Sequence, residues 1–260
     1  MKNKYIQILK KMRIIGADLK EAMRHKRSFT TKSERQHYVT EYDIKADKEL
    51  VKLVKKLFPH DSITSEENPA IKGTSDVCWY IDPISNTRNF IHGLPGFAIS
   101  VGVMNIKTQE PVAGFVYDPM LDEMFTAEIG KGAFLNGDKI QVSNIEYGEH
   151  AFINADWQKR RTYKEVEEGM DIFTRVGREC TVRAVGSVAL MVAYTAMGRL
   201  DGMVNNYSDR FALIPAWPII REAGGEILDL QGNKWNLDSN STFVTNNKIT
   251  KGILACLKKS

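Results

Sequence analysis

Apolar residues recur with two different periods along this chain of 260 residues. Over residues 1–25 they recur every three to four positions, which predicts an amphipathic helix. The same period over residues 44–57 predicts a second helix, ended by Pro59. The polar residues 25–37 between the helices indicate a loop or a short hairpin. The expected apolar face of the second helix contains Ile44, Leu50, Val51, Val54 and Leu57.

Shorter apolar runs bounded by turn residues predict strands in the first half of the chain. Residues 62–64 and 77–81 are rich in β-branched and aromatic side chains, and we expect both to be buried strands. Gly and Asn-Gly turns then separate several alternating runs, which predicts a meandering antiparallel sheet. These further strands are expected over residues 98–106, 112–117, 122–128 and 132–142.

The second half alternates between strand-like and helix-like patterns, which is typical of an α/β protein. We place a seam near residue 145, so that residues 1–145 and 146–260 form two halves of one compact unit. Strands are expected over 151–155, near Thr181 and over 200–204, with helices over 162–176, 187–197 and 211–223, before a final strand, loop and helix.

The composition is that of a globular protein, and it also bears on where in the cell the protein is expected. The hydrophobic content of 43% and charged content of 26% are ordinary. No apolar run approaches the roughly 20 residues of a membrane span, and the N-terminus lacks a signal-peptide core. Three widely spaced cysteines predict buried free thiols in the cytoplasm. The net charge of +4 comes from dispersed residues, so we expect binding to neither nucleic acid nor membrane.

The candidate chemistry lies where the strand over residues 77–81 ends. Asp82 follows this strand, and we expect Pro83 to turn the chain there. Asn86 and Thr87 then begin a short helix, whose free backbone N–H groups favour an anion. A carboxylate beside such a helix start can hold a metal ion against a phosphate. The alternative is a plain turn at the end of a strand.

A longer motif surrounds Asp82 and runs Asp82-Pro83-Ile84-x-x-Thr87-x-Asn89-Phe90. It resembles the signature of the inositol monophosphatase family, Asp-Pro-Ile/Leu-Asp-Gly-Thr-x-Asn-Phe. The resemblance covers roughly residues 5–250. Similar matches in the same order are Val39-Thr40-x-x-Asp43, Ser65-Glu66-Glu67, Tyr117-Asp118-Pro119, Lys131 to Gly137, Gly186-Ser187, Gly198 to Asp201 and Glu222 to Gly225.

The resemblance implies an αβαβα layered sandwich, Mg²⁺-dependent hydrolysis of small phosphate monoesters, and a homodimer. By this match one Mg²⁺ ion is held by Glu67, Asp82 and the Ile84 carbonyl. Glu67 and Thr87 then orient the attacking water, so both are candidate catalytic residues. The match leaves two readings for Asp43, as a charge at a helix start or as a peripheral metal contact.

The departures from the family pattern fall on the second metal ion. The family's second aspartate is Ser85 here, and its C-terminal metal aspartate is Ala212. We therefore expect one ion, or none. Arg88 and Arg210 are close in sequence to the vacated positions, and a guanidinium can bind phosphate bidentately. They are either substitutes for the metal or ordinary surface arginines.

The substrate contacts are also expected to differ. Asn205 stands where the family has an inositol-binding glutamate, so inositol 1-phosphate is a poor candidate. The expected phosphate and substrate contacts are Ser85, Asn86, Thr87, Arg88, Asn205 and Arg210.

Three functions are compatible with this sequence. The first is weak or repurposed phosphate-ester chemistry on a small sugar, cyclitol or nucleotide phosphate, by hydrolysis, elimination or transfer. The second is a pseudophosphatase that binds a phosphorylated ligand or partner without turnover. The third is a conventional Mg²⁺-dependent phosphatase that takes its missing ligands from elsewhere in the chain.

Overall fold

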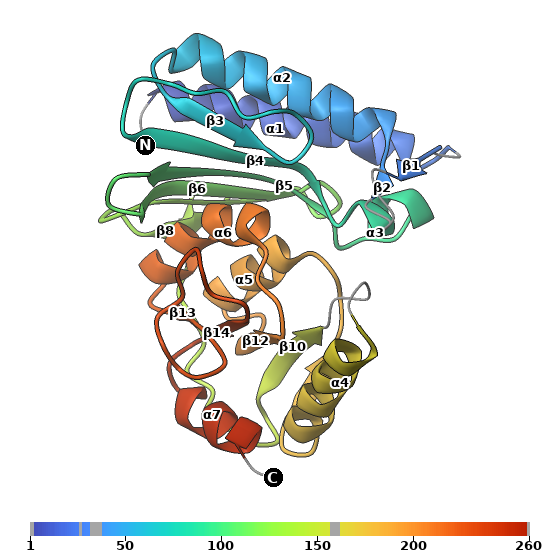
Figure 1. Ribbon diagram of the computed structural model, residues 1–260, viewed down its shortest axis with the longest axis vertical. Helices are drawn as coiled ribbons and strands as arrows, with labels where there is room; N and C mark the ends of the chain where they lie inside the picture. The colour runs from blue at the N-terminus through green and yellow to red at the C-terminus, as the bar shows by residue number, and fades with distance from the viewer. Residues whose placement is uncertain (1–2, 26–27, 32–37, 157–161, 259–260) are drawn as a thin grey trace.

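The computed structural model describes residues 3–25, 28–31, 38–156 and 162–258. Layers of helices alternate with two β-sheets, in the order helix, sheet, helix, sheet, helix (Figure 1). The predicted αβαβα layered sandwich is confirmed. In the described part of the chain, no helix is both long and apolar enough to cross a membrane.

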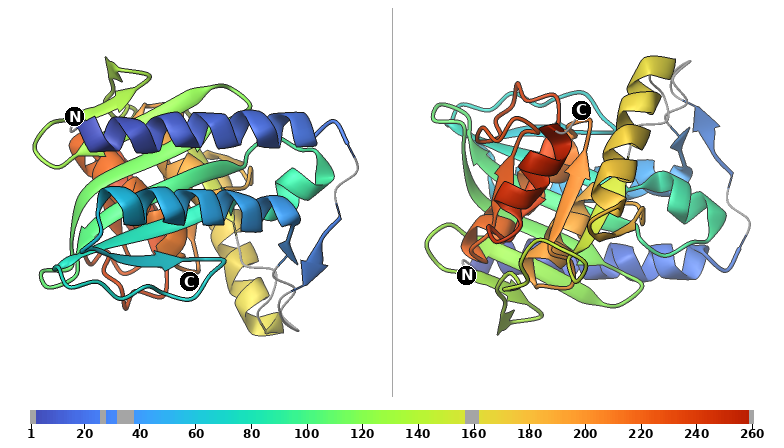
Figure 2. Two further views of the ribbon diagram at one scale, coloured as in Figure 1. Left: turned by 90° about the horizontal axis from the view of Figure 1, so that it is seen from above. Right: turned by 90° about the horizontal axis from the view of Figure 1, so that it is seen from below.

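The first layer consists of α1 (Asn3–Ala22) and α2 (Glu41–Leu57), which lie side by side on the larger sheet (Figure 2). The α2 residues that face inward are Asp43, Ala46, Asp47, Leu50 and Val54. Ile44 is 40% exposed, so the predicted apolar face is wrong at this position. The face is shifted because two buried aspartates, which hydrophobic periodicity treats as exposed, belong to it.

A short hairpin follows α1, as one of the two readings of residues 25–37 predicts. Its strands, β1 (Thr30–Thr31) and β2 (Tyr38–Val39), pair antiparallel. Residues 26–27 and 32–37 of that prediction lie outside the described residues.

The larger sheet is formed by consecutive strands of the first half. Its order is β3-β4-β5-β6-β7-β8-β9, and every neighbouring pair is antiparallel except β3 and β4, which are parallel. The short helix α3 (Thr87–His92) follows β4 directly. The strands are β3 (Ser62–Ser65), β4 (Val77–Ser85), β5 (Ala98–Asn105), β6 (Glu110–Asp118), β7 (Glu123–Glu128), β8 (Ala133–Leu135) and β9 (Asp138–Lys139).

The central layer consists of α5 (Val188–Ala196) and α6 (Arg210–Glu222), between the two sheets. Both helices contribute buried apolar side chains to the core that joins the sheets. The contact of α6 with the larger sheet is close, because a Cβ atom added to Gly114 would lie 1.9 Å from the Pro215 carbonyl oxygen. This contact holds α6 against the sheet, and α6 begins at the site described below.

The smaller sheet has the order β11-β10-β12-β14-β13 and mixes parallel and antiparallel pairs. Helices α4 (Tyr163–Gly177) and α7 (Thr250–Lys258) form the last layer (Figures 1 and 2). Cys78, Cys180 and Cys256 are buried free thiols, as predicted. The strands are β10 (Phe152–Asp156), β11 (Thr181–Arg183), β12 (Gly202–Asn205), β13 (Glu226–Leu228) and β14 (Thr242–Thr245).

Candidate active site

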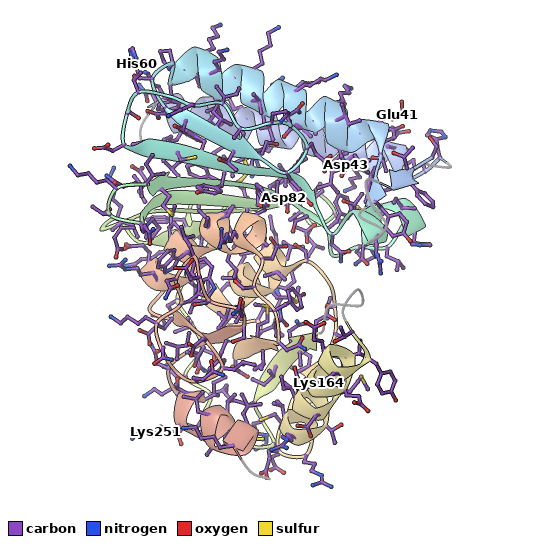
Figure 3. All side chains as sticks on the ribbon, viewed as in Figure 1. Glu41, Asp43, His60, Asp82, Lys164 and Lys251 are labelled. Atoms are coloured by element: carbon purple, nitrogen blue, oxygen red, sulfur yellow. The ribbon has the colours of Figure 1, made fainter. Side chains whose placement is uncertain are left out.

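A pocket of about 560 Å³ opens where β4, α3 and the first residues of α6 meet. Asp82 lies at this junction, on the same side of the molecule as Asp43 at the start of α2 (Figure 3). The loop at residues 184–188, which precedes and enters α5, forms part of the wall. The pocket therefore takes side chains from both halves of the chain.

The chain does not turn at Pro83 as predicted, because β4 continues to Ser85. The pairing of β4 with β5 shifts register between Asp82 and Ser85. Such an irregularity accommodates a proline, which has no N–H to give to the ladder. The extra length of strand carries Asp82, Ile84 and Ser85 along the floor of the pocket.

Asp82 is 2% exposed, and its Oδ1 has no hydrogen-bond partner among the described residues. Burial raises the pKa of this carboxyl well above its ordinary value, and the negative charges of Glu66 and Asp209 raise it further. The Ser85 hydroxyl acts in the opposite direction. A buried carboxylate left without a partner is costly unless a cation or a proton neutralises it.

Glu66, rather than Glu67, faces this carboxylate. Glu66 follows β3, and its N–H donates to the Ile81 carbonyl at 3.1 Å, which holds it next to β4. Glu66 lines the pocket and Glu67 is absent from its wall. The negative charge of Glu66 raises the pKa of the Asp82 carboxyl, so this glutamate lies beside it. Glu66, and not the predicted Glu67, is therefore the glutamate that faces the pocket.

Thr87, the first residue of α3, links the pocket to α2. Its hydroxyl lies 3.1 Å from Asp43 Oδ1 and 3.1 Å from the Ile84 carbonyl oxygen. The Thr40 N–H donates to Asp43 Oδ2 at 2.7 Å, as part of a capping box at the start of α2. Asp43 is thus a helix-start residue, the first of its two readings, and it is also the carboxylate that Thr87 contacts.

Asn86 adopts a left-handed conformation, with φ of 70°, and its side chain caps α3 by accepting from the Asn89 N–H at 3.4 Å. The backbone at Gly186 lies close to it, since a Cβ there would be 2.3 Å from Asn86 Nδ2. This approach brings Ser187 against the pocket floor, where its hydroxyl donates to Ser85 Oγ at 2.9 Å. Ser85 therefore makes a polar contact with Ser187 on the pocket floor.

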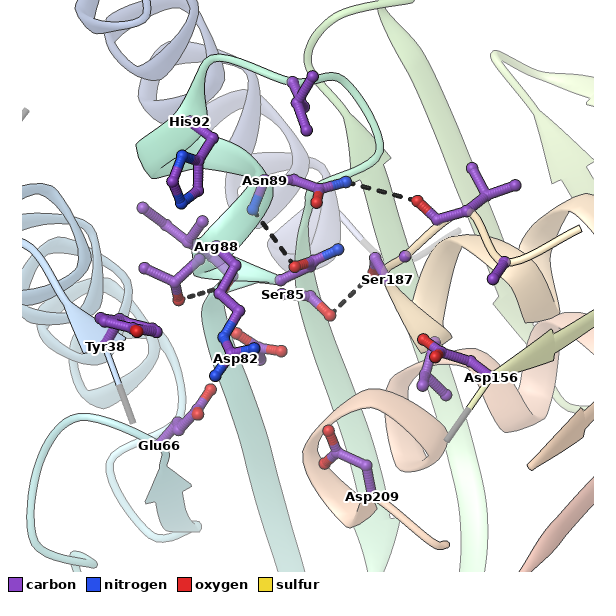
Figure 4. A pocket seen from close by; sticks show the side chains of 18 of the residues that line it. Tyr38, Glu66, Asp82, Ser85, Arg88, Asn89, His92, Asp156, Ser187 and Asp209 are labelled. Carbon is purple, nitrogen blue, oxygen red and sulfur yellow. Dashed lines mark hydrogen bonds between the residues drawn. The ribbon is translucent and has the colours of Figure 1, made fainter. Parts of the chain in front are cut away.

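Of the two arginines considered, Arg88 lies at the pocket and Arg210 does not. The guanidinium of Arg88 is 5.0 Å from the centre of the Tyr38 ring and extends toward Glu66 and Asp82 (Figure 4). Its Nε is buried without a hydrogen-bond partner among the described residues. Arg210 is exposed at the start of α6.

Asn205 is 1% exposed in β12 and lies outside the pocket wall. Its Oδ1 accepts the Asp156 N–H at 3.2 Å, across the β10–β12 pair. The prediction that it contacts substrate does not fit this placement, because the side chain is buried and bonded to the backbone of the neighbouring strand. Ala212 is also fully buried, on the side of α6 that belongs to the core.

Asp209 lies in the pocket wall, although its offset of three residues from Ala212 argues against a ligand role and it is not among the predicted site residues. It caps α6, with Oδ1 accepting from the N–H groups of Phe211 at 3.0 Å and Ala212 at 3.4 Å, and it lines the pocket. Asp156, at the end of β10, lines the same wall (Figure 4). An aspartate directly before a helical pattern is a cap signal, and that signal was available in the sequence.

Side chains alone supply only part of the ligand set that Mg²⁺ requires. In the part of the chain that the structure describes, no three His, Cys, Asp or Glu side chains form a ready metal site. Mg²⁺, however, is commonly bound through one or two carboxylates plus waters and substrate phosphate. Glu66, the unpartnered Asp82 oxygen and the Ile84 carbonyl meet that requirement.

A comparison with protein families decides the relationship of this chain to known proteins. The model described as the inositol monophosphatase family matches residues 3–260. The chain belongs to the inositol monophosphatase family. Members of this family are phosphatases of small phosphorylated molecules and generally depend on Mg²⁺.

Individual members of the inositol monophosphatase family are similar over most of their length. The fructose-1,6-bisphosphatase/inositol-1-monophosphatase of Thermotoga maritima is 36% identical over 211 residues, which cover 81% of this chain and 78% of the relative. Inositol monophosphatase 1 of Bos taurus is 32% identical over 241 residues, covering 90% and 86%. The crystal structure of the extragenic suppressor protein suhB from Bartonella henselae superposes with a TM-score of 0.90 at 27% identity, covering 98% and 99%.

Proposed function

We propose that this protein performs Mg²⁺-dependent chemistry on a small phosphate monoester in the pocket beside Asp82. The observation that carries the proposal is the buried Asp82 oxygen without a partner, next to Glu66. This arrangement costs stability in the absence of a cation, and a divalent ion is the partner that two adjacent carboxylates favour. Sugar, cyclitol and nucleotide monophosphates are the substrate classes.

In this proposal Glu66, Asp82 and the Ile84 carbonyl hold one Mg²⁺ ion. A bound Mg²⁺ ion lowers the pKa of a coordinated water and stabilises charge that develops on phosphoryl oxygens. Thr87 and Asp43 position that water, since the two are already linked at 3.1 Å. The second half of the metal site is weaker, because Ser85 and Ala212 stand where the family has aspartates.

The phosphate group is bound by donors at the start of α3. The backbone N–H groups of Asn86 and Thr87 and the guanidinium of Arg88 line the pocket. The buried, unpartnered Nε of Arg88 supports an anionic ligand there, because an arginine beside a phosphate forms charge-assisted hydrogen bonds. Arg210 and Asn205 are removed from this set. The homodimer and the cytoplasmic location remain predictions.

The test is phosphate release with Mg²⁺ from a panel of sugar, cyclitol and nucleotide monophosphates. Native protein should release phosphate from at least one compound, and Glu66→Gln should lower that activity by about 10²-fold or more. Glu67→Gln is the matched control and should stay within about threefold. Binding of the compounds without release would favour the pseudophosphatase, and activity lost in Glu67→Gln but kept in Glu66→Gln would contradict the assigned site.

A further inference from the structure

Asp47 is a fully buried carboxylate in the middle of α2, and the proposed reaction gives it no role. Its Oδ1 accepts the hydroxyl of Ser65, and its Oδ2 accepts the side-chain amide of Asn68. A buried charge costs stability unless hydrogen bonds offset that cost, and an apolar side chain at this position would avoid it. Packing of α2 against the sheet therefore does not account for a carboxylate here.

The two donors to Asp47 are the two ends of the bend that carries Glu66. Ser65 is the last residue of β3, and Asn68 is the third residue of the bend that follows. The hydroxyl oxygen of Ser65 also accepts the Glu67 N–H at 3.3 Å, so the same side chain shapes the interior of the bend. Asp47 thus closes the bend from the side of α2, with one carboxylate oxygen for each end.

Glu66 is held from a second side by β4. Its N–H donates to the Ile81 carbonyl at 3.1 Å, immediately before Asp82. The bend is therefore fixed to two different elements, to β4 by this backbone bond and to α2 by Asp47. A ligand side chain keeps its geometry when the residues around it are fixed in this way.

A second buried aspartate of α2 makes the corresponding contact with the other side of the site. Asp43 precedes Asp47 by four residues, so both lie on the same face of the helix. The Thr87 hydroxyl lies 3.1 Å from Asp43 Oδ1. One face of α2 therefore contacts both the start of α3 and the bend that carries Glu66, and it sets the spacing between them.

We propose that Asp47 is a positioning residue, which acts through Ser65 and Asn68 to hold the Glu66 carboxylate at the Mg²⁺ position. Asp47 is not part of the pocket wall, so its effect on the ion is transmitted by the bend. This inference rests on the proposed function, because the ion is the one that Glu66 and Asp82 are proposed to hold.

Isothermal titration of the full-length protein with Mn²⁺, at a temperature where every variant is folded, tests the proposal. Asp47→Asn should weaken Mn²⁺ binding by about 10–100-fold, the usual effect of losing a residue that orients a metal ligand. An amide has one acceptor oxygen where the carboxylate uses two.

Asp61→Asn is the matched control. The Asp61 carboxylate also accepts two side-chain donors, Ser75 Oγ at 2.7 Å and Trp79 Nε1 at 2.9 Å, but Asp61 lies outside the pocket wall. This variant should lose stability in urea unfolding and keep its Mn²⁺ affinity within about threefold, because no orienting contact to the site is lost. An equal loss of Mn²⁺ affinity in both variants would overturn the positioning role.

Two further variants separate positioning from a general loss of stability. Asp47→Asn combined with Asn68→Asp exchanges the carboxylate and the amide at unchanged net charge, and it should restore most of the native affinity. Asn68→Ala leaves α2 unchanged and removes one of the two bonds, so it should weaken Mn²⁺ by about tenfold even if Asp47→Asn does not fold.

The outcomes distinguish this inference from the proposed function. Native affinity in both Asp47→Asn and Asn68→Ala, with binding lost in Glu66→Gln, would overturn the positioning role alone. No binding of Mn²⁺ by native protein would overturn the proposed function together with this inference.

Discussion

The burial of Asp82 lowers the stability of the folded protein. Its carboxyl is buried, one oxygen has no partner among the described residues, and its pKa is raised by burial and by the charges of Glu66 and Asp209. Such a group keeps its proton in the folded state at pH values where the unfolded chain has lost it. Folding is therefore penalised at neutral pH in the absence of a cation, as is common where a site is built for function.

Replacing Asp82 with Asn should stabilise the metal-free protein at pH 7 by about 0.5–2 kcal/mol, the usual gain when such a penalty is removed. Both states are protonated below the ordinary Asp pKa of 3.8, so the gain should disappear there and grow as the pH rises toward the raised folded-state pKa. Thermal unfolding in EDTA over a pH series measures it.

Asp229 provides a control, because its pKa is shifted in the opposite direction to that of Asp82. Burial alone would raise its pKa, but hydrogen bonds from Asn233, Gln231 and Gly232 outweigh burial and lower it. Asp229→Asn should therefore destabilise the protein at neutral pH, and the difference in stability should fade as the pH falls below the unfolded-state pKa.

A loss of stability in metal-free Asp82→Asn at pH 7 would contradict the account of Asp82, because it would show that the Asp82 carboxylate has a structural partner.

Substitution of Thr87 tests whether this residue positions the attacking water. Thr87→Val removes the hydroxyl near Asp43 Oδ1 and the Ile84 carbonyl, and the change should cost about 1.5–3 kcal/mol of stability because one acceptor is charged. Activity should fall by about 10²-fold or more. Thr87→Ser keeps the hydroxyl and should retain most of both. Equal activity in the Val and Ser variants would exclude the hydroxyl from the reaction.

At the scale of elements, the site depends on where α6 begins, and α6 is positioned by its contact with two glycines of the sheet. A Cβ at Gly102 would lie 2.8 Å from Pro215 Cα, and one at Gly114 would lie 1.9 Å from the Pro215 carbonyl oxygen. These side chains would push α6 away from the sheet. Asp209, at the first turn of α6, would move with it.

Gly114→Ala should therefore destabilise the protein by about 1–3 kcal/mol, the usual cost of overpacking, and should also weaken Mn²⁺ binding. Gly177→Ala, at the end of α4, is the control, because its Cβ would meet only Val182 at an ordinary 3.8 Å. Urea unfolding and metal titration of both variants measure the two effects. Unchanged metal affinity in a destabilised Gly114→Ala protein would show that α6 does not position the site.

The elements were largely predictable from hydrophobic period, and the errors have specific causes. The pattern over residues 44–57 predicted α2, but misplaced Ile44 because Asp43 and Asp47 are buried. Pro83 was expected to end β4, and the register shift with β5 accommodates it instead. Glu66 and Glu67 are equivalent in sequence, and only the course of the chain through the bend after β3 decides which of them faces the pocket.

At the scale of the whole molecule, the pocket is a junction between the larger sheet and the central helical layer. Glu66 and Asp82 come from the first half of the chain, whereas Ser187 and Asp209 come from the second. The family resemblance predicted this fold correctly. It could not place Asn205 and Arg210, because their side-chain directions depend on how β12 and α6 pack in this chain.

A ligand that contacts both halves should stabilise the whole molecule. Mg²⁺ with inorganic phosphate at about 100 times its dissociation constant should add about 2.7 kcal/mol by linkage. Differential scanning calorimetry should show this as a rise in Tm of about 2–4 °C per kcal/mol. Glu66→Gln should abolish the rise and Glu67→Gln should retain it. An equal rise in both variants would mean that the ions bind elsewhere.

The most direct measurement is anomalous diffraction at the Mn²⁺ edge from crystals of the native protein soaked with Mn²⁺ and inorganic phosphate. The account predicts an anomalous peak in contact with Glu66, Asp82 and the Ile84 carbonyl, with the phosphate between that ion and the start of α3. A pocket in which Arg88 contacts Asp82 directly and no ion binds, or an ion coordinated by Glu67, would contradict it.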